Sequence, residues 1–126
     1  MDIERQKEQV GFFHYDTRNF EFEATNGTPE TRINVQLHIL EDVNGVVETD
    51  SVVQVNLSAL IVLDNFVLSS ALAQVNLIKN RKIENQEDLS QEELQELASP
   101  LFDLLKRLTY ELTEVALDEP GLKLEF

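Results

Sequence analysis

The sequence contains no cysteine, and other residues that chemistry often needs are scarce or isolated. Without cysteine there is no disulfide, no thiolate nucleophile and no cysteine-ligated zinc site. The four glycines lie far apart along the chain, which excludes a glycine-rich phosphate loop. A Gly-x-Ser-x-Gly nucleophile motif and a His-Glu-x-x-His metal motif are absent too. These absences remove the common sequence signatures of an enzyme.

Basic residues are also few: 10 lysines and arginines stand against 24 aspartates and glutamates, for a formal net charge of −14. Nucleic acid binding requires clustered cations, so we expect no nucleic acid partner, and an anionic membrane surface is disfavoured as well. The basic cluster at residues 79–82 is predicted to be a solvated strand end rather than a phosphate site. The acidic surface keeps the protein soluble, although it could also attract a basic partner.

Long hydrophobic runs are missing. No stretch approaches the roughly 20 apolar residues of a membrane span, and the first residues are charged rather than apolar as in a signal peptide. We therefore expect a cytoplasmic protein without membrane insertion. We predict a charged tail over residues 1–9, mobile or partly helical, and a single domain over residues 10–126.

The centre of the chain, Ser51 to Ile78, carries one ionisable side chain, Asp64, although 27% of all residues are charged. Its first part alternates apolar and polar residues, and beyond Ser58 both faces become apolar. Asp64-Asn65 is a turn pair. This pattern predicts two long antiparallel strands with a two-faced apolar tip, which is covered by the rest of the fold, covered by another subunit, or open to an apolar ligand.

Two further strands precede this hairpin. Residues 10–24 alternate aromatic and polar residues, and a phase change between Tyr15 and Phe20 predicts a bulge or bend at residues 16–19. Arg32 to Leu40 alternates cleanly, which predicts a half-buried strand. Residues 42–50 are predicted to be a connection, in which 46–47 could form a short ribbon.

Helical signals follow the strands. Ser90 and Glu93 form a capping box that starts a short helix, which Ser99-Pro100 is predicted to end while starting a second helix. The second helix carries an apolar stripe, a candidate oligomer interface, made of Leu101, Leu105, Leu108, Leu112 and Val115. Residues 122–126 are predicted to be a short strand or an extended tail on an apolar surface. The fold class is therefore α+β, a four-stranded antiparallel sheet with helices packed on one face.

The residues that could take part in catalysis or metal binding do not form a recognisable site in the sequence. His14 and His38 lie on strands without metal-ligand spacing, and we interpret His38 as a surface residue and His14, which lies among aromatic residues, as a packed or edge residue. The acidic run from Glu84 to Glu96 lacks the glycine of a calcium loop, and the start of a helix favours carboxylates in any case. We expect Glu21 and Glu23 to share a strand face, with nothing nearby to raise a pKa. The sequence therefore predicts a non-enzymatic protein with no cofactor and no metal.

Three features taken together resemble the protein-export chaperone SecB, and more closely the small, uncharacterised SecB-like family of Gram-positive bacteria. One is Phe22-Glu23-Ala24-Thr25-Asn26, similar to the Phe-Glu-Ala-x-Asn of SecB. Another is the order of the strands. The third is Ser99-Pro100-Leu101-Phe102 at the start of the long helix, with the later Pro120-Gly121-Leu122-Lys123-Leu124. The resemblance covers most of residues 10–126.

The resemblance implies a SecB-like fold, assembly as a homodimer or homotetramer, and binding of unfolded polypeptides in apolar grooves. It implies a polypeptide-binding set consisting of Val35, Leu37, Ile39, Leu122, Leu124 and Phe126. It also implies that acidic residues on the sheet contact a partner such as the export motor. Glu23 matches one such position, and Glu21 and Glu23 are the candidate acidic contacts. SecB continues beyond the matching segment into a further helix that helps form the groove, so we expect half of that groove wall to have no counterpart in residues 1–126.

Two functions follow as hypotheses. The first is a chaperone-like protein that holds extended apolar segments without ATP. The second is an oligomeric interaction or scaffold module that binds one specific protein partner.

Overall fold

The computed structural model describes residues 1–40, 45–46, 48–117 and 121–124. The sheet is antiparallel and four strands wide, in agreement with the α+β prediction. Its strands are β1 (Asp2–Arg5), β2 (Gln9–Thr17), β3 (Arg32–Leu40), β4 (Ser51–Val62) and β5 (Phe66–Lys79). The inner strands are β4 and β5. The edge strand β3 pairs with β4, whereas β2 and β1 follow one another along the outer side of β5.

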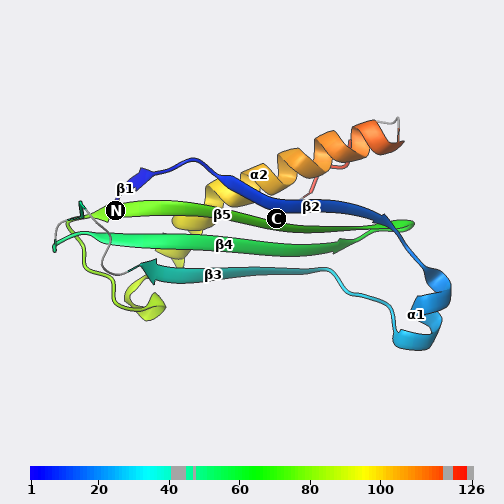
Figure 1. The fold of residues 1–126 in the computed structure, drawn as a ribbon, viewed down its shortest axis with the longest axis horizontal. Helices are drawn as coiled ribbons and strands as arrows, with labels where there is room; N and C mark the ends of the chain where they lie inside the picture. The colour runs from blue at the N-terminus through cyan, green and yellow to red at the C-terminus, as the bar shows by residue number, and fades with distance from the viewer. Residues whose placement is uncertain (41–44, 47, 118–120, 125–126) are drawn as a thin grey trace.

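The central hairpin is confirmed. β4 and β5 pair from Ser51↔Ile78 to Val62↔Val67, and the Leu63 amide donates to the Phe66 carbonyl across the turn at 2.9 Å. Both strands have a neighbour on each side, which explains why they contain so little charge. Helix α2 (Gln91–Leu117) runs diagonally across one face of the sheet, and in this view its C-terminal end extends beyond β2 (Figure 1).

The core lies between α2 and this face of the sheet. Alternate residues of β4, among them Val53, Val55 and Leu57, meet Leu97, Leu101 and Leu105 of the helix, and all six are at most 1% exposed. The hairpin tip is therefore covered in part by the chain itself, because Ile61, Phe66 and Leu68 belong to the same buried cluster.

The predicted strand over residues 10–24 is wrong in its second half. Residues Phe20–Asn26 form helix α1, which leads from β2 past the hairpin turn to β3 (Figure 1). Asn19 caps this helix, since its side chain accepts from the Phe22 amide at 3.0 Å. The phase change at residues 16–19 thus marks a strand-to-helix junction, and the bulge lies instead between Val10 and Phe12.

The prediction of a mobile or partly helical segment is wrong for Asp2–Arg5, which form strand β1. Ile3 pairs with Ile78 of β5 and packs against the core, and Glu4 forms an ion pair with Lys79 at 3.3 Å. The division of the chain into a 1–9 tail and a 10–126 domain stays a prediction.

The prediction of two helices separated at Ser99-Pro100 is also wrong, because α2 is continuous and Pro100 lies inside it. The capping box is confirmed: the Ser90 hydroxyl accepts from the Glu93 amide at 3.2 Å, and the Ser90 amide donates to the Glu93 carboxylate at 3.0 Å. A 3-10 turn, η1 (Gln86–Asp88), precedes the helix. In the predicted connection over 42–50, residues 42–44 and 47 lie outside the described residues.

After α2, residues 121–124 run without regular secondary structure. The Leu122 amide donates to the Thr113 hydroxyl at 2.7 Å, and Leu124 packs against the core cluster. This agrees with the predicted extended segment on an apolar surface for these residues; residues 125–126 lie outside the described part of the chain.

Candidate functional site

A groove lies between the edge strand β3 and the first half of α2, defined as residues 91–105; residues 106–117 are the second half. It has a volume of about 300 Å³. Its lining consists of Val35, Leu37, Gln86, Gln91, Leu94, Gln95, Ala98 and Phe102. None of these side chains is ionisable, which sets the groove apart from the acidic surface around it. Aliphatic and aromatic groups surrounded by neutral amides suit an uncharged, extended apolar ligand.

Periodicity explains how the sequence builds the groove. Val35 and Leu37 are two residues apart on β3, so both side chains point to the α2 face of the sheet. Leu94, Ala98 and Phe102 are four residues apart, so they line one side of α2. Among the described strands β3 pairs only with β4, so this outer strand, which lines the groove, has one edge unpaired by them. The site therefore combines an apolar floor with a free strand edge.

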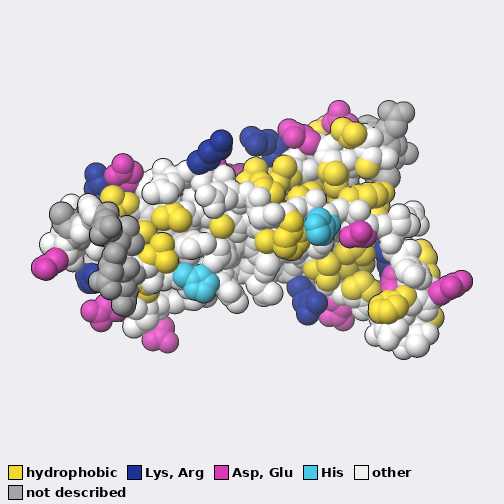
Figure 2. Space-filling model, in the orientation of Figure 1, with side chains coloured by type: hydrophobic (Ala, Val, Ile, Leu, Met, Phe, Trp, Pro, Cys, Tyr) yellow, Lys and Arg dark blue, Asp and Glu magenta, His cyan; other side chains and the backbone are white. Residues whose placement is uncertain are grey.

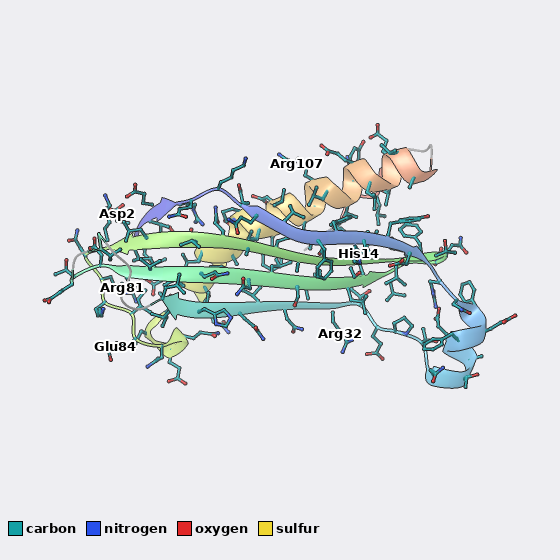
Figure 3. The ribbon with its side chains drawn as sticks, viewed as in Figure 1. Asp2, His14, Arg32, Arg81, Glu84 and Arg107 are labelled. Atoms are coloured by element: carbon teal, nitrogen blue, oxygen red, sulfur yellow. The ribbon has the colours of Figure 1, made fainter. Side chains whose placement is uncertain are left out.

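The start of α2 is fixed beside the groove by Arg81, which lies at the end of the sheet (Figure 3). Its guanidinium donates to both carboxylate oxygens of Glu93, through Nη2 at 3.0 Å and also through Nη1, and to the Asp88 carbonyl at 2.6 Å. The Arg81 guanidinium, with the Ser90 amide, lowers the pKa of Glu93 to about 2. The same pairing raises the pKa of Arg81.

A buried serine fixes the segment before η1. The Ser51 hydroxyl accepts from the Ile83 amide at 2.7 Å and donates to the Arg81 carbonyl at 2.8 Å. Ser51 is 4% exposed and Ile83 is 1% exposed. These contacts tie the loop to β4 and so determine where α2 begins.

The structure brings together two of the six polypeptide-binding residues inferred from the sequence. Val35 and Leu37 line the groove, whereas Ile39 packs against the core without lining it. Leu122 and Leu124 do not line it either; the Leu122 amide contacts Thr113, in the second half of α2. Phe126 lies outside the described residues.

Sequence reasoning missed the helical wall of the groove, Leu94, Ala98 and Phe102. Their spacing of four residues was a usable signal. It was hidden because the helix was divided at Pro100, which placed Leu94 and Ala98 in one helix and Phe102 in another.

Glu21 and Glu23 lie on α1, not on a strand, which corrects the predicted shared strand face. Glu21 is exposed, but the Glu23 carboxylate accepts two hydrogen bonds from Arg18, at 2.5 and 3.1 Å. This pairing lowers the pKa of Glu23. Arg18 also donates to the Leu63 and Asp64 carbonyls, at 2.9 and 3.3 Å. Glu23 thus contributes to a link between α1 and the hairpin turn.

The predicted oligomer stripe divides into two parts. Leu101 and Leu105 are fully buried inside the chain, so their side chains have no surface left for a partner. Leu108 and Leu112 are half-buried, and Val115 is 83% exposed. Only the second part of the stripe is accessible.

The sheet face opposite α2 is mostly uncharged, and most charged side chains of this view lie around its margin (Figure 2). A shallow hollow there is lined in part by Ser58, Ala71 and Ala73 of the inner strands. His38 is exposed on this face, as predicted. His14, predicted to be a packed or edge residue, is exposed on the outer strand β2, and its ring lies tilted against the Phe12 ring with centroids 4.8 Å apart (Figure 3).

In the described part of the chain, no group of three or more potential ligands could hold a metal ion. None of the described helices is long and apolar enough to cross a membrane.

The fold has known counterparts. A protein of unknown function from Streptococcus agalactiae has a similar crystal structure, with 40% sequence identity, a TM-score of 0.92, and coverage of 100% of this chain and 98% of that one. The Mycobacterium tuberculosis SecB-like chaperone Rv1957, in complex with a ChAD peptide from the Rv1956 HigA1 antitoxin, is similar at 13% identity and a TM-score of 0.55. That match covers 98% of this chain and 90% of the chaperone. The second likeness shows the SecB-like fold alone.

No curated protein matches the sequence at a significant level. The family described as "Protein of unknown function (DUF1149)" matches residues 1–126, the whole chain. Because the match spans the full sequence, the chain belongs to the DUF1149 family.

Proposed function

We propose that this protein binds polypeptides without catalysis, as a SecB-like chaperone of the holdase type, and that the groove between β3 and α2 is its binding site. One observation carries the proposal: an uncharged apolar groove lies directly beside a free strand edge, on a protein whose net charge is −14.

The groove and the strand edge supply complementary interactions. Apolar client side chains that enter the groove leave water, which stabilises the complex by about 25 cal/mol per Å² of apolar surface buried. An extended client can also pair its backbone with the free edge of β3. Neither interaction needs ATP. Every second client side chain would face the groove, so the expected client is an extended segment with alternating apolar residues.

The comparison structures support this proposal at the level of fold. The mycobacterial chaperone, which shares the SecB-like fold, was solved with a peptide bound. That peptide comes from one antitoxin, which also favours the second candidate function, an oligomeric interaction module dedicated to one specific protein partner.

A pair of substitutions on β3 tests the site. Val35→Asp places a carboxylate in the groove, where it would be desolvated without a partner, and it should weaken binding of an apolar peptide at least tenfold. The control, Asn34→Asp, adds the same charge at an exposed position on the opposite face of the strand. Peptide titration by calorimetry, with unfolding curves for both variants, gives the readout. Equal binding by V35D and the wild type would exclude the groove as the site.

The two functions differ in client range. A holdase should suppress aggregation of several unrelated unfolded proteins at stoichiometric amounts, and V35D should reduce that effect. A dedicated module would suppress none of them and would retrieve one protein from a lysate instead.

Assembly and location are part of the same proposal. We propose a homodimer or homotetramer in the cytoplasm that uses the accessible part of the α2 stripe, with the exposed Glu21 as an acidic contact for a protein partner, since the Glu23 carboxylate is paired with Arg18. Sedimentation analysis tests the assembly, because a strict monomer at micromolar concentration would contradict it.

A further inference from the structure

Pro100 lies inside α2, where it should interrupt the helix. A proline has no backbone N–H, so the Glu96 carbonyl loses the donor that residue 100 would otherwise provide. The proline ring also crowds the carbonyl four residues earlier, which normally kinks or ends a helix. Nevertheless α2 is continuous from Gln91 to Leu117.

Arg5 provides the missing donor from a distant part of the sequence. Its Nη2 donates to the Glu96 carbonyl at 2.6 Å and its Nη1 donates to the Leu97 carbonyl at 3.1 Å. The Ser99 hydroxyl adds a longer hydrogen bond to the Glu96 carbonyl at 3.3 Å. A guanidinium is suited to this role because its fork of donors can reach two neighbouring acceptors at once.

Arg5 is itself held by the sheet. It pairs with Asn76 of β5 at the end of β1, and β1 is attached by the half-buried Ile3, which packs against the core, and by the Glu4–Lys79 ion pair. The position of α2 at Pro100 thus depends on the docking of a four-residue edge strand.

Arg5 and the groove lie on opposite sides of α2. Arg5 belongs to β1 and the groove is lined by β3, and these two strands lie at opposite edges of the sheet that α2 crosses. Leu94 and Ala98 line the groove, together with Phe102. The helical wall of the groove therefore includes residues on both sides of Pro100, and Arg5 binds the helix from the sheet edge opposite to β3.

We propose that β1 is a clamp that acts through Arg5 on the Pro100 break of α2, and that release of this clamp lets α2 move away from β3 and opens the groove. The class of ligand that the groove binds is taken from the proposed function, and the proposal rests on that function to this extent. The clamp itself does not depend on it. The segment that the sequence suggested was a tail thereby controls the shape of the binding site.

Backbone hydrogen exchange tests the clamp without any ligand. Arg5→Gln removes the forked donor, and we expect at least tenfold faster exchange of the amides of residues 101 and 102. Pro100→Ala restores an N–H that can donate to the Glu96 carbonyl, so in this background R5Q should change the exchange less than threefold. Lys7→Gln makes the same charge change at an exposed neighbour and should have no effect. Unchanged exchange in R5Q, or an equal effect with and without P100A, would overturn the clamp.

The opening of the groove has a separate readout. Because the chain has no native cysteine, two introduced cysteines, Glu92→Cys on α2 and His38→Cys on β3, are the only attachment points for spin labels, and both positions are exposed and do not line the groove. Pulsed electron paramagnetic resonance should show a longer and broader distribution of distances between the two labels in R5Q, and the wild-type distribution in R5Q/P100A. An identical distribution in R5Q would refute the coupling to the groove. If the wild type binds no apolar peptide, the proposed function fails while these two measurements still decide the clamp.

Discussion

The two halves of α2 look alike in sequence but differ in their surroundings. The first half is capped by Ser90, paired through Arg81 and Glu93, held by Arg5, and buried through Leu97, Leu101 and Leu105. The second half has two buried threonines, Thr109 and Thr113, half-buried leucines at 108 and 112, and an exposed Val115. In Figure 1 this half extends beyond the edge of the sheet.

The difference shows that one apolar stripe can serve two purposes. Leucines at helical spacing face one side throughout the helix, but Leu101 and Leu105 are fully buried, whereas Leu108 and Leu112 pack against the core and stay half-buried. The first half is therefore buried more deeply, and the second half leaves part of its apolar side exposed.

The largest expected effect on the free energy of unfolding comes from shortening a buried side chain in the first half of α2. Leu101→Ala removes a fully buried side chain from the core and should reduce the free energy of unfolding by about 2–5 kcal/mol. Leu108→Ala makes the same chemical change at a half-buried position, so its cost should be clearly smaller. Denaturant unfolding of both variants measures the difference. Equal costs would mean that the two halves contribute alike to folding, against the comparison.

The fold could be predicted well where local pattern and long-range pairing agree. The β4–β5 hairpin and β3 were predicted from alternation, turn residues and the lack of charge. Residues 20–24 were not, because Phe20, Phe22 and Ala24 also alternate, and the Asn19 cap that makes this segment helical was not recognised. β1 was missed because four charged or half-buried residues give no pattern until they meet the edge of β5.

The site was only half predictable. Val35 and Leu37 follow from alternation on β3, but the opposite wall depends on α2 passing unbroken through Pro100. The donor that permits this, Arg5, is 91 residues away in sequence from Glu96, so no local rule could reveal it. Leu122 and Leu124 were grouped with β3 by resemblance, whereas the structure packs this segment against the second half of α2.

A smaller loss of stability is expected where the loop before α2 is attached to β4. Ser51→Ala deprives the buried Ile83 amide of its acceptor, which should cost about 1–3 kcal/mol of stability. Ser58→Ala, at an exposed position on the same strand, should change stability by no more than about 0.5 kcal/mol. Thermal unfolding of the pair tests whether the loop before α2 is anchored by this hydroxyl. A loss in S51A no larger than that in S58A would show that it is not.

The ion pair at the start of α2 predicts a pH dependence. The folded-state pKa of Glu93, about 2, lies below its ordinary value of 4.5, so its stabilising contribution is complete above pH 4.5 and is lost as the pH falls toward 2. Glu93→Gln should remove this contribution and give a flatter stability profile between pH 4.5 and 2. The pKa of Glu23 is also lowered, so Glu23→Gln makes the same chemical change as Glu93→Gln at the other end of the molecule and serves as its matched variant. Unfolding midpoints across this pH range, with identical slopes for E93Q and the wild type, would contradict the assignment.

The smallest effect on folding is expected at the end of the second half. Val115 is 83% exposed, so Val115→Asp should change the free energy of unfolding of a protomer by about 0.5 kcal/mol or less. If the second half of α2 is an interface between copies, however, the new carboxylate would be buried against a partner in a protein that already carries a net charge of −14. V115D should then shift sedimentation toward the monomer, whereas Glu114→Gln, at an exposed neighbouring position, should not. An unchanged assembly in V115D would leave the exposed end of the stripe without a role between copies, and the two halves of α2 would then differ in burial alone.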